Sequence, residues 1–98
     1  FLALRGQAVR VDGGGKPYAT GSLGEKDALL EAVDRDGWNE YHVVARGNTL
    51  IHSINGRVMS VVADVDSPEP ARGGQIGMQV HVGPPMKVEF RNIRLRTE

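Results

Sequence analysis

The dipeptide Asn55-Gly56 constrains the fold of this chain more than any other feature of its sequence. A two-residue type I′ turn needs positive φ at both central positions, and Asn followed by Gly adopts them at the lowest cost. Runs of β-branched and apolar residues flank the turn over 49–54 and 57–63. The pattern predicts a β-hairpin whose register is fixed by the turn, with His52 on its more apolar side. The expected facing pairs are Ile54 with Arg57, His52 with Met59, and Leu50 with Val61.

Alternation of apolar and polar side chains predicts a strand on each side of this hairpin. Over 38–46, Tyr41, Val43 and Ala45 share one face, and Gly47-Asn48 is a suitable turn into the strand at 49–54. Residues 75–82 alternate strictly and predict a strand with one buried face. Another strand is expected over 87–96. Its apolar phase slips by one residue, which predicts a β-bulge near Arg91-Asn92.

The remaining segments predict short elements and turns. Residues 1–11 suit two short strand pieces joined at a bend at Gly6. A glycine-rich turn is expected at 12–15, a short strand over 17–24, and one helical turn over 26–33. The acidic and proline-rich stretch 64–74 is expected to be a surface loop. An all-β fold follows, in agreement with thirteen glycines and five prolines in 98 residues.

Bulk composition narrows the classes of function. The length allows one domain, and twelve basic residues balance twelve acidic ones, which argues against a nucleic-acid partner. No apolar run reaches the roughly 20 residues of a transmembrane helix, so no transmembrane segment is expected. Cysteine is absent, which excludes disulfides and thiolate chemistry. The chain opens on Phe1 within an apolar run, and we therefore expect a processed product or a fragment.

Five pieces of the second half, taken in order, resemble the C-terminal half of the 3-keto-disaccharide hydrolase family. They are Trp38-Asn39-Glu40-Tyr41 through Asn48, Ile54-Asn55-Gly56, Gly74 through His81, Gly83-Pro84-Pro85, and Val88 through Arg94. No single piece is specific, but their combination is. The resemblance covers 38–96 and fades before Trp38.

The resemblance implies a fold, an activity and a location. It implies an antiparallel β-sandwich of the concanavalin-like jelly-roll type, of which this chain would be an incomplete domain. The missing half of the domain, or another protein chain, would then cover its exposed faces. It also implies an exported protein, periplasmic or extracellular, with a carbohydrate partner. The implied reaction is the cleavage of glycosides first oxidised to 3-keto sugars. A non-catalytic, lectin-like binding or structural module remains the alternative.

His81 and Gln79 are the leading catalytic candidates. They share the polar face of the expected strand at 75–82, and an imidazole there suits a general base. Glu40 and His42, two residues apart on one strand face, are assigned as assisting groups, with a solvated outer face as the alternative. For His81 the alternative is an exposed histidine without a special role.

Trp38 and Arg91 are the candidates for substrate binding. Trp38, the single tryptophan, suits stacking on a sugar ring or, alternatively, a structural anchor. Arg91 lies at the expected bulge, where side chains are often re-aimed beside active sites, and a structural role is its alternative. Asp64, Asp66 and Glu69 suggest a calcium ion or another divalent metal, against the simpler reading of a solvated loop. His52 is expected to be a satisfied core histidine.

Overall fold

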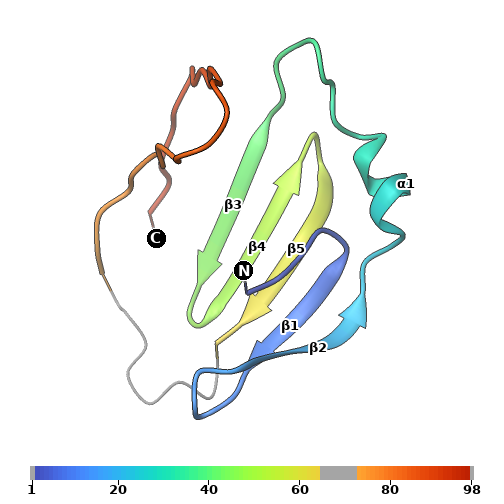
Figure 1. Ribbon diagram of the computed structural model, residues 1–98. Helices are drawn as coiled ribbons and strands as arrows, with labels where there is room; N and C mark the ends of the chain where they lie inside the picture. The colour runs from blue at the N-terminus through green and yellow to red at the C-terminus, as the bar shows by residue number, and fades with distance from the viewer. Residues whose placement is uncertain (1, 65–72, 98) are drawn as a thin grey trace.

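A computed structural model describes residues 2–64 and 73–97, and it contains one five-stranded sheet and one short helix (Figure 1). The strand order is β2-β1-β5-β4-β3. The elements are β1 (Gln7–Val11), β2 (Pro17–Ser22), α1 (Lys26–Leu30), β3 (Tyr41–Arg46), β4 (Thr49–Ile54) and β5 (Arg57–Ala63). The expected all-β fold is confirmed. A second sheet is absent from the described residues, so the fold is shown as a sheet and its sandwich form stays a prediction.

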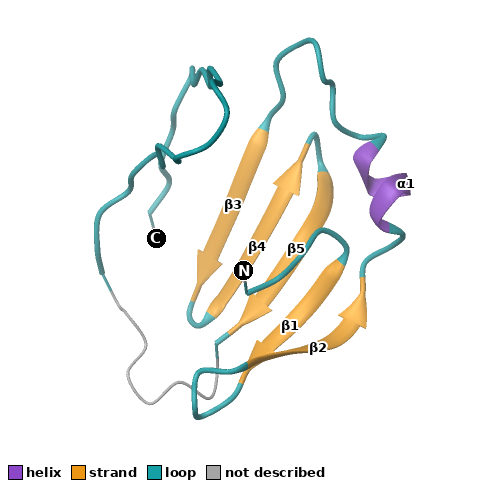
Figure 2. Cartoon of the chain, in the orientation of Figure 1, coloured by secondary structure: helices purple, strands orange, loops and turns teal. Residues whose placement is uncertain are grey.

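The sheet is mixed, and it departs from the expected antiparallel arrangement at one pair of strands. Hairpins β1–β2, β3–β4 and β4–β5 are antiparallel, but β1 pairs with β5 in parallel, from Gln7 opposite Ser60 to Arg10 opposite Ala63. Turn residues specify hairpins locally, whereas a parallel pair joins distant segments and leaves no local signal. The parallel pair places β1 and β2 on one side of the β3–β4–β5 meander (Figure 2).

The Asn55-Gly56 turn forms as expected, but the register beyond it does not. Both residues have positive φ, 51° and 79°, and Ile54 faces Arg57 as predicted. The register then shifts between His52 and Ser53, so that His52 faces Ser60 and Leu50 faces Val62. The predicted pairs with Met59 and Val61 were therefore wrong. One extra residue on β5 is accommodated as a β-bulge at Met59, a device that turn residues do not encode.

The core is small and lies where β1, β5 and α1 meet. Its buried apolar side chains are Val9, Val11, Leu29, Met59 and Val62. Leu29 is fully buried and anchors α1, which Arg5 also contacts by donating from its Nε to the Lys26 carbonyl at 2.8 Å. The helical turn expected over 26–33 is thus confirmed over Lys26–Leu30. Burial of one leucine accounts for a helix that is too short to be stable alone.

Two strands begin later in the chain than the sequence predicted. Of the two strand pieces expected over 1–11, only Gln7–Val11 is a strand, while the bend at Gly6 is present with a φ of 93°. The strand expected to start at Trp38 starts at Tyr41. Just before β3, Glu40 bonds Asn55 instead of continuing a ladder: its amide donates to Asn55 Oδ1 and its carbonyl accepts from the Asn55 amide.

The two strands expected in the C-terminal part do not form, and these predictions were wrong. Residues 73–97 contain neither helix nor strand, and every one of their side chains is exposed. Alternation shows which face of a strand would be buried, but a strand also needs a neighbour to pair its backbone groups. Without a ladder there is no bulge either, although Asn92 has a φ of 55° near the expected place. Figure 2 shows the segment as a long loop beside β3.

Within 2–64 and 73–97, no helix has the length and apolar character needed to cross a membrane.

Candidate functional site

Trp38 and Arg91, both expected to bind substrate, lie in contact although they are far apart in the sequence. The Arg91 guanidinium carbon lies 3.9 Å from the centroid of the Trp38 ring, a cation–π contact. Trp38 precedes β3, and Arg91 belongs to the C-terminal segment. The contact therefore fixes this segment against the chain that enters the sheet. Trp38 remains 49% exposed, which leaves part of the indole open to a ligand.

A polar hollow of about 270 Å³ opens beside this pair. It is lined by Asp36, Gly37 and Trp38 from one side and by Lys87 and Glu89 from the other. Lys87 Nζ and Glu89 Oε1 form an ion pair of 2.9 Å between exposed side chains. The hollow combines an aromatic surface with carboxylates and an ammonium group, the donors and acceptors that hydroxyl-rich ligands need. Sequence reasoning did not single out Asp36, Lys87 or Glu89, although Glu89 lies within the family-like piece Val88 through Arg94.

Two asparagines hold the segment that carries Trp38. Asn55 Nδ2 donates to the Ala32 carbonyl at 2.7 Å and to Asn39 Oδ1 at 2.8 Å, and Asn55 Oδ1 accepts from the Glu40 amide at 2.9 Å. The Asn55 backbone amide donates to the Glu40 carbonyl at 2.9 Å. Sequence analysis recognised Asn55 only as a turn residue. Its side-chain role leaves no sequence signal separate from that turn.

Glu40 and His42 lie near the start of β3 and are exposed. Glu40 binds Asn55 through its backbone groups, and His42 faces Ser53 across the β3–β4 pair. Their alternation along the chain agrees with a shared strand face, although Glu40 precedes the strand itself. Their assignment as assisting groups stays a prediction.

His81 and Gln79 lie in the C-terminal segment, where both side chains are exposed. Among the described residues, no hydrogen bond, ion pair or ring contact joins either of them to Glu40 or His42. Contacts of these kinds therefore do not bring the four catalytic candidates together. A cation–π contact does join the two substrate-binding candidates.

Tyr41 and His52 form a pair across the β3–β4 hairpin. The Tyr41 hydroxyl and His52 Nδ1 form a hydrogen bond, and the ring centroids lie 5.7 Å apart. They are diagonal neighbours on one sheet face, since Val43 is the direct partner of His52. Partial burial raises the pKa of Tyr41 above its ordinary value of 10.0, so the phenol is protonated at neutral pH. His52 thus has a hydrogen-bond partner, as expected, but it is half-buried and does not belong to the core.

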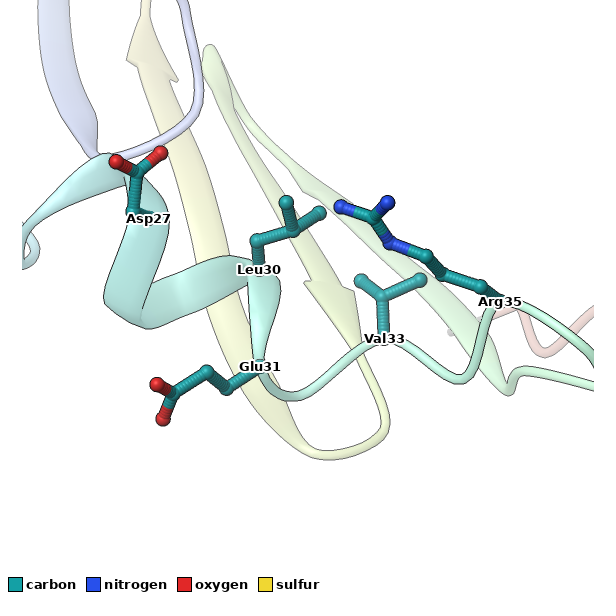
Figure 3. Close-up of a pocket in the computed structure, with 5 residues that line it drawn as sticks. All are labelled: Asp27, Leu30, Glu31, Val33 and Arg35. Carbon is teal, nitrogen blue, oxygen red and sulfur yellow. The ribbon is translucent and has the colours of Figure 1, made fainter.

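A second hollow of similar size lies beside α1 (Figure 3). Asp27, Leu30, Glu31, Val33 and Arg35 line it. Figure 3 shows the Arg35 guanidinium directed toward Leu30 and Val33, with the two carboxylates on the other side. Two apolar side chains and charges of both signs make this hollow less specific in chemistry than the one beside Trp38.

Metal binding was predicted from Asp64, Asp66 and Glu69. Asp66 and Glu69 lie outside the described residues, and Asp64 is half-buried at the end of that range. Within the described part of the chain, no three His, Asp or Glu side chains are grouped as metal ligands. The metal assignment therefore stays a prediction from the sequence.

Comparison with known proteins identifies a family. A family model described as a 3-keto-alpha-glucoside-1,2-lyase-like domain matches residues 4–96. The match begins well before Trp38, where the sequence analysis placed the start of its resemblance, and it takes in β1, β2 and α1. No curated protein and no solved structure matches the chain.

Proposed function

The chain belongs to the family of 3-keto-alpha-glucoside-1,2-lyase-like domains, and on that premise we propose that it binds a 3-keto-glycoside in the hollow beside Trp38 and Arg91. The family makes this a carbohydrate-related domain. The observation that carries the proposal is the stack of Arg91 on Trp38, 3.9 Å from guanidinium carbon to ring centroid, at the edge of a hollow with polar lining.

The chemistry of a pyranose ring fits this lining. A sugar presents a face of C–H groups, which packs on an aromatic ring, and a rim of hydroxyls, which hydrogen-bond to charged side chains. Trp38 supplies the aromatic surface, with Asp36 and Glu89 as acceptors. Lys87 supplies a cation for a ketone oxygen, which accepts hydrogen bonds and cannot donate them.

Cleavage of the glycoside is the second candidate function, supported by the family. A ketone at C3 acidifies the proton on C2. A base that removes this proton lets the C2–H electrons form a C1–C2 double bond while the C1–O bond breaks, and the departing oxygen takes up a proton. His81 is the proposed base, with Gln79, Glu40 and His42 as assisting groups. Binding is the primary proposal because, among the described residues, no hydrogen bond, ion pair or ring contact joins His81 or Gln79 to Glu40 or His42.

Titration calorimetry with methyl 3-keto-α-glucoside tests the binding function. We expect the intact chain to bind this ligand more tightly than methyl α-glucoside. Trp38→Ala and Arg91→Ala should each weaken the affinity about tenfold, equivalent to about 1.4 kcal/mol. Tyr18→Ala is the matched control, because Tyr18 is a similarly exposed aromatic residue on β2. Equal affinities for both sugars, or an equal loss in the control, would refute the assigned site.

Release of methanol from the same ligand tests cleavage. Turnover that is abolished in His81→Ala while binding persists would support His81 as the base. Binding without turnover would support the non-catalytic alternative. We further propose a periplasmic or extracellular location, which fits a domain that meets glycosides from outside the cell, and fractionation of expressing cells tests it.

A further inference from the structure

The segment between α1 and β3 carries Trp38 and contains no helix or strand between Glu31 and Glu40. Loops of this kind are usually more mobile than the elements that they connect. A side chain that stacks on a ligand must nevertheless be held in place before the ligand arrives, since ordering it on binding weakens the affinity. The contacts of this segment therefore decide how well Trp38 can serve as a platform.

Asn55 contacts this segment at three residues. Its amide group bonds the Ala32 carbonyl, Asn39 Oδ1 and the Glu40 amide, at 2.7, 2.8 and 2.9 Å. These partners lie on both sides of Trp38 in the sequence. A turn residue with a φ of 51° needs no such contacts, because glycine adopts that conformation with no side chain at all.

Asn39 continues the contact toward Trp38. Its Oδ1 accepts from the Asp34 amide at 2.7 Å, and its Nδ2 donates to the Asp34 carbonyl at 2.7 Å and the Gly37 carbonyl at 3.4 Å. Trp38 lies between Gly37 and Asn39, so a neighbour on each side is tied to this amide. The two asparagines thus connect the rigid β4–β5 turn to the backbone around Trp38.

We propose that Asn55 is a positioning residue for carbohydrate binding: acting through Asn39, its side-chain amide holds the 32–40 segment so that the Trp38 indole is fixed against Arg91 before the sugar arrives. This inference rests on the proposed function for its consequence in binding. The positioning itself does not depend on any ligand.

The single tryptophan of the chain allows a direct test, since all tryptophan fluorescence reports on Trp38. Asn55→Gly keeps the turn conformation and removes all three side-chain bonds. Asn55→Asp keeps the acceptor for the Glu40 amide and removes the two donated bonds. Asn48→Gly makes the same substitution in the β3–β4 turn and serves as the matched control. Acrylamide quenching and fluorescence anisotropy are measured on all four proteins, with circular dichroism to verify folding.

We expect the quenching constant of Trp38 to rise about twofold in Asn55→Gly, to rise at least as much in Asn55→Asp, whose new carboxylate oxygen would face two acceptor oxygens, and to stay unchanged in Asn48→Gly. The affinity for methyl 3-keto-α-glucoside should fall about tenfold in Asn55→Gly, in proportion to the mobility of the indole. A residue that merely stabilised the fold would lower the melting temperature without changing Trp38 quenching well below the transition.

Unchanged quenching and anisotropy in folded Asn55→Gly would overturn the positioning role, whatever the sugar does. Raised mobility of Trp38 in the variant, together with no sugar binding by the unmodified chain, would refute the binding function and support the positioning role. If Asn55→Gly fails to fold, Asn39→Ala carries the same test, because it removes the second amide and leaves the turn untouched.

Discussion

Gly6 lies at a close backbone approach that leaves no room for a side chain. Its φ is 93°, its amide donates to the Met59 carbonyl at 2.7 Å, and its carbonyl accepts from the Leu23 amide at 2.8 Å. A Cβ atom built here would lie 2.7 Å from the Gly24 carbonyl oxygen. Gly6 thus allows the close backbone approach that joins β1, β5 and the end of β2 around Leu29.

Gly6→Ala should lower the free energy of unfolding by about 2 kcal/mol or more, from backbone strain and the clash together. Gly15→Ala separates the two causes, because Gly15 has a similar φ of 80° but open space around it. Strain alone should reduce its stability by about 1 kcal/mol. Urea unfolding measures both, and equal losses would show that the approach to Gly24 does not matter.

Tyr41 should make stability depend on pH in the alkaline range. Its folded-state pKa lies above the ordinary 10.0, so the unfolded chain releases the phenolic proton first as pH rises. The contribution of Tyr41 is complete below about pH 10 and is lost as pH rises through the folded-state pKa. Tyr41→Phe should flatten this part of the urea-unfolding profile, whereas Tyr18→Phe should leave it unchanged. The same alkaline slope in Tyr41→Phe would contradict the assignment.

At the scale of elements, local turn chemistry explains what could be predicted. The hairpins around Gly47-Asn48 and Asn55-Gly56 follow from residues that accept positive φ, and both form. The parallel pairing of β1 with β5 joins residues more than fifty positions apart and has no comparable signal. The bulge at Met59 was missed because Met59 fits either register as an apolar side chain.

The candidate site, too, could be predicted only in its local features. Trp38 and Arg91 could be named singly from residue chemistry, but their stacking depends on how the C-terminal segment meets the start of β3. The strict alternation at 75–82 was read as a strand, yet it specifies only which side chains would share a face. The side-chain hydrogen bonds of Asn55 could not be predicted, because its place in the turn already explains an asparagine at this position.

The attachment of α1 depends on Leu29, which is fully buried at 0% exposure. Leu29→Ala should lower the free energy of unfolding by about 2 to 4 kcal/mol, because it opens a cavity beside Gly6 and Gly24. Leu30→Ala, at the half-buried next position, should have less than half that effect. Chemical denaturation compares the two. A similar loss for both would indicate that several contacts along α1 hold the helix, and not Leu29 alone.

At the scale of the whole molecule, many large apolar side chains are exposed to solvent. Tyr41, Val43 and Val44 are exposed on the edge strand β3. The C-terminal segment adds a second exposed set: Ile76, Met78, Val80, Val82, Met86, Val88, Phe90, Ile93 and Leu95. An edge strand with unpaired backbone groups beside an exposed apolar chain favours association. That these surfaces need a partner therefore stays a prediction, which a measurement of self-association tests.

Sedimentation velocity at rising concentration should show self-association of the unmodified chain, driven by this exposed apolar surface. Val80 and Val82 are 98% and 94% exposed, so Val80→Lys with Val82→Lys removes apolar surface without opening a cavity. This double variant should stay monomeric to concentrations at least about tenfold higher. Gln75→Lys with Gln79→Lys adds the same charge to the same segment at its polar positions, and it should weaken association less, since charge repulsion is then its only effect. A chain that stays monomeric throughout would contradict the prediction. Equal effects of the two double variants would show that charge repulsion, and not the loss of apolar contact, weakens association.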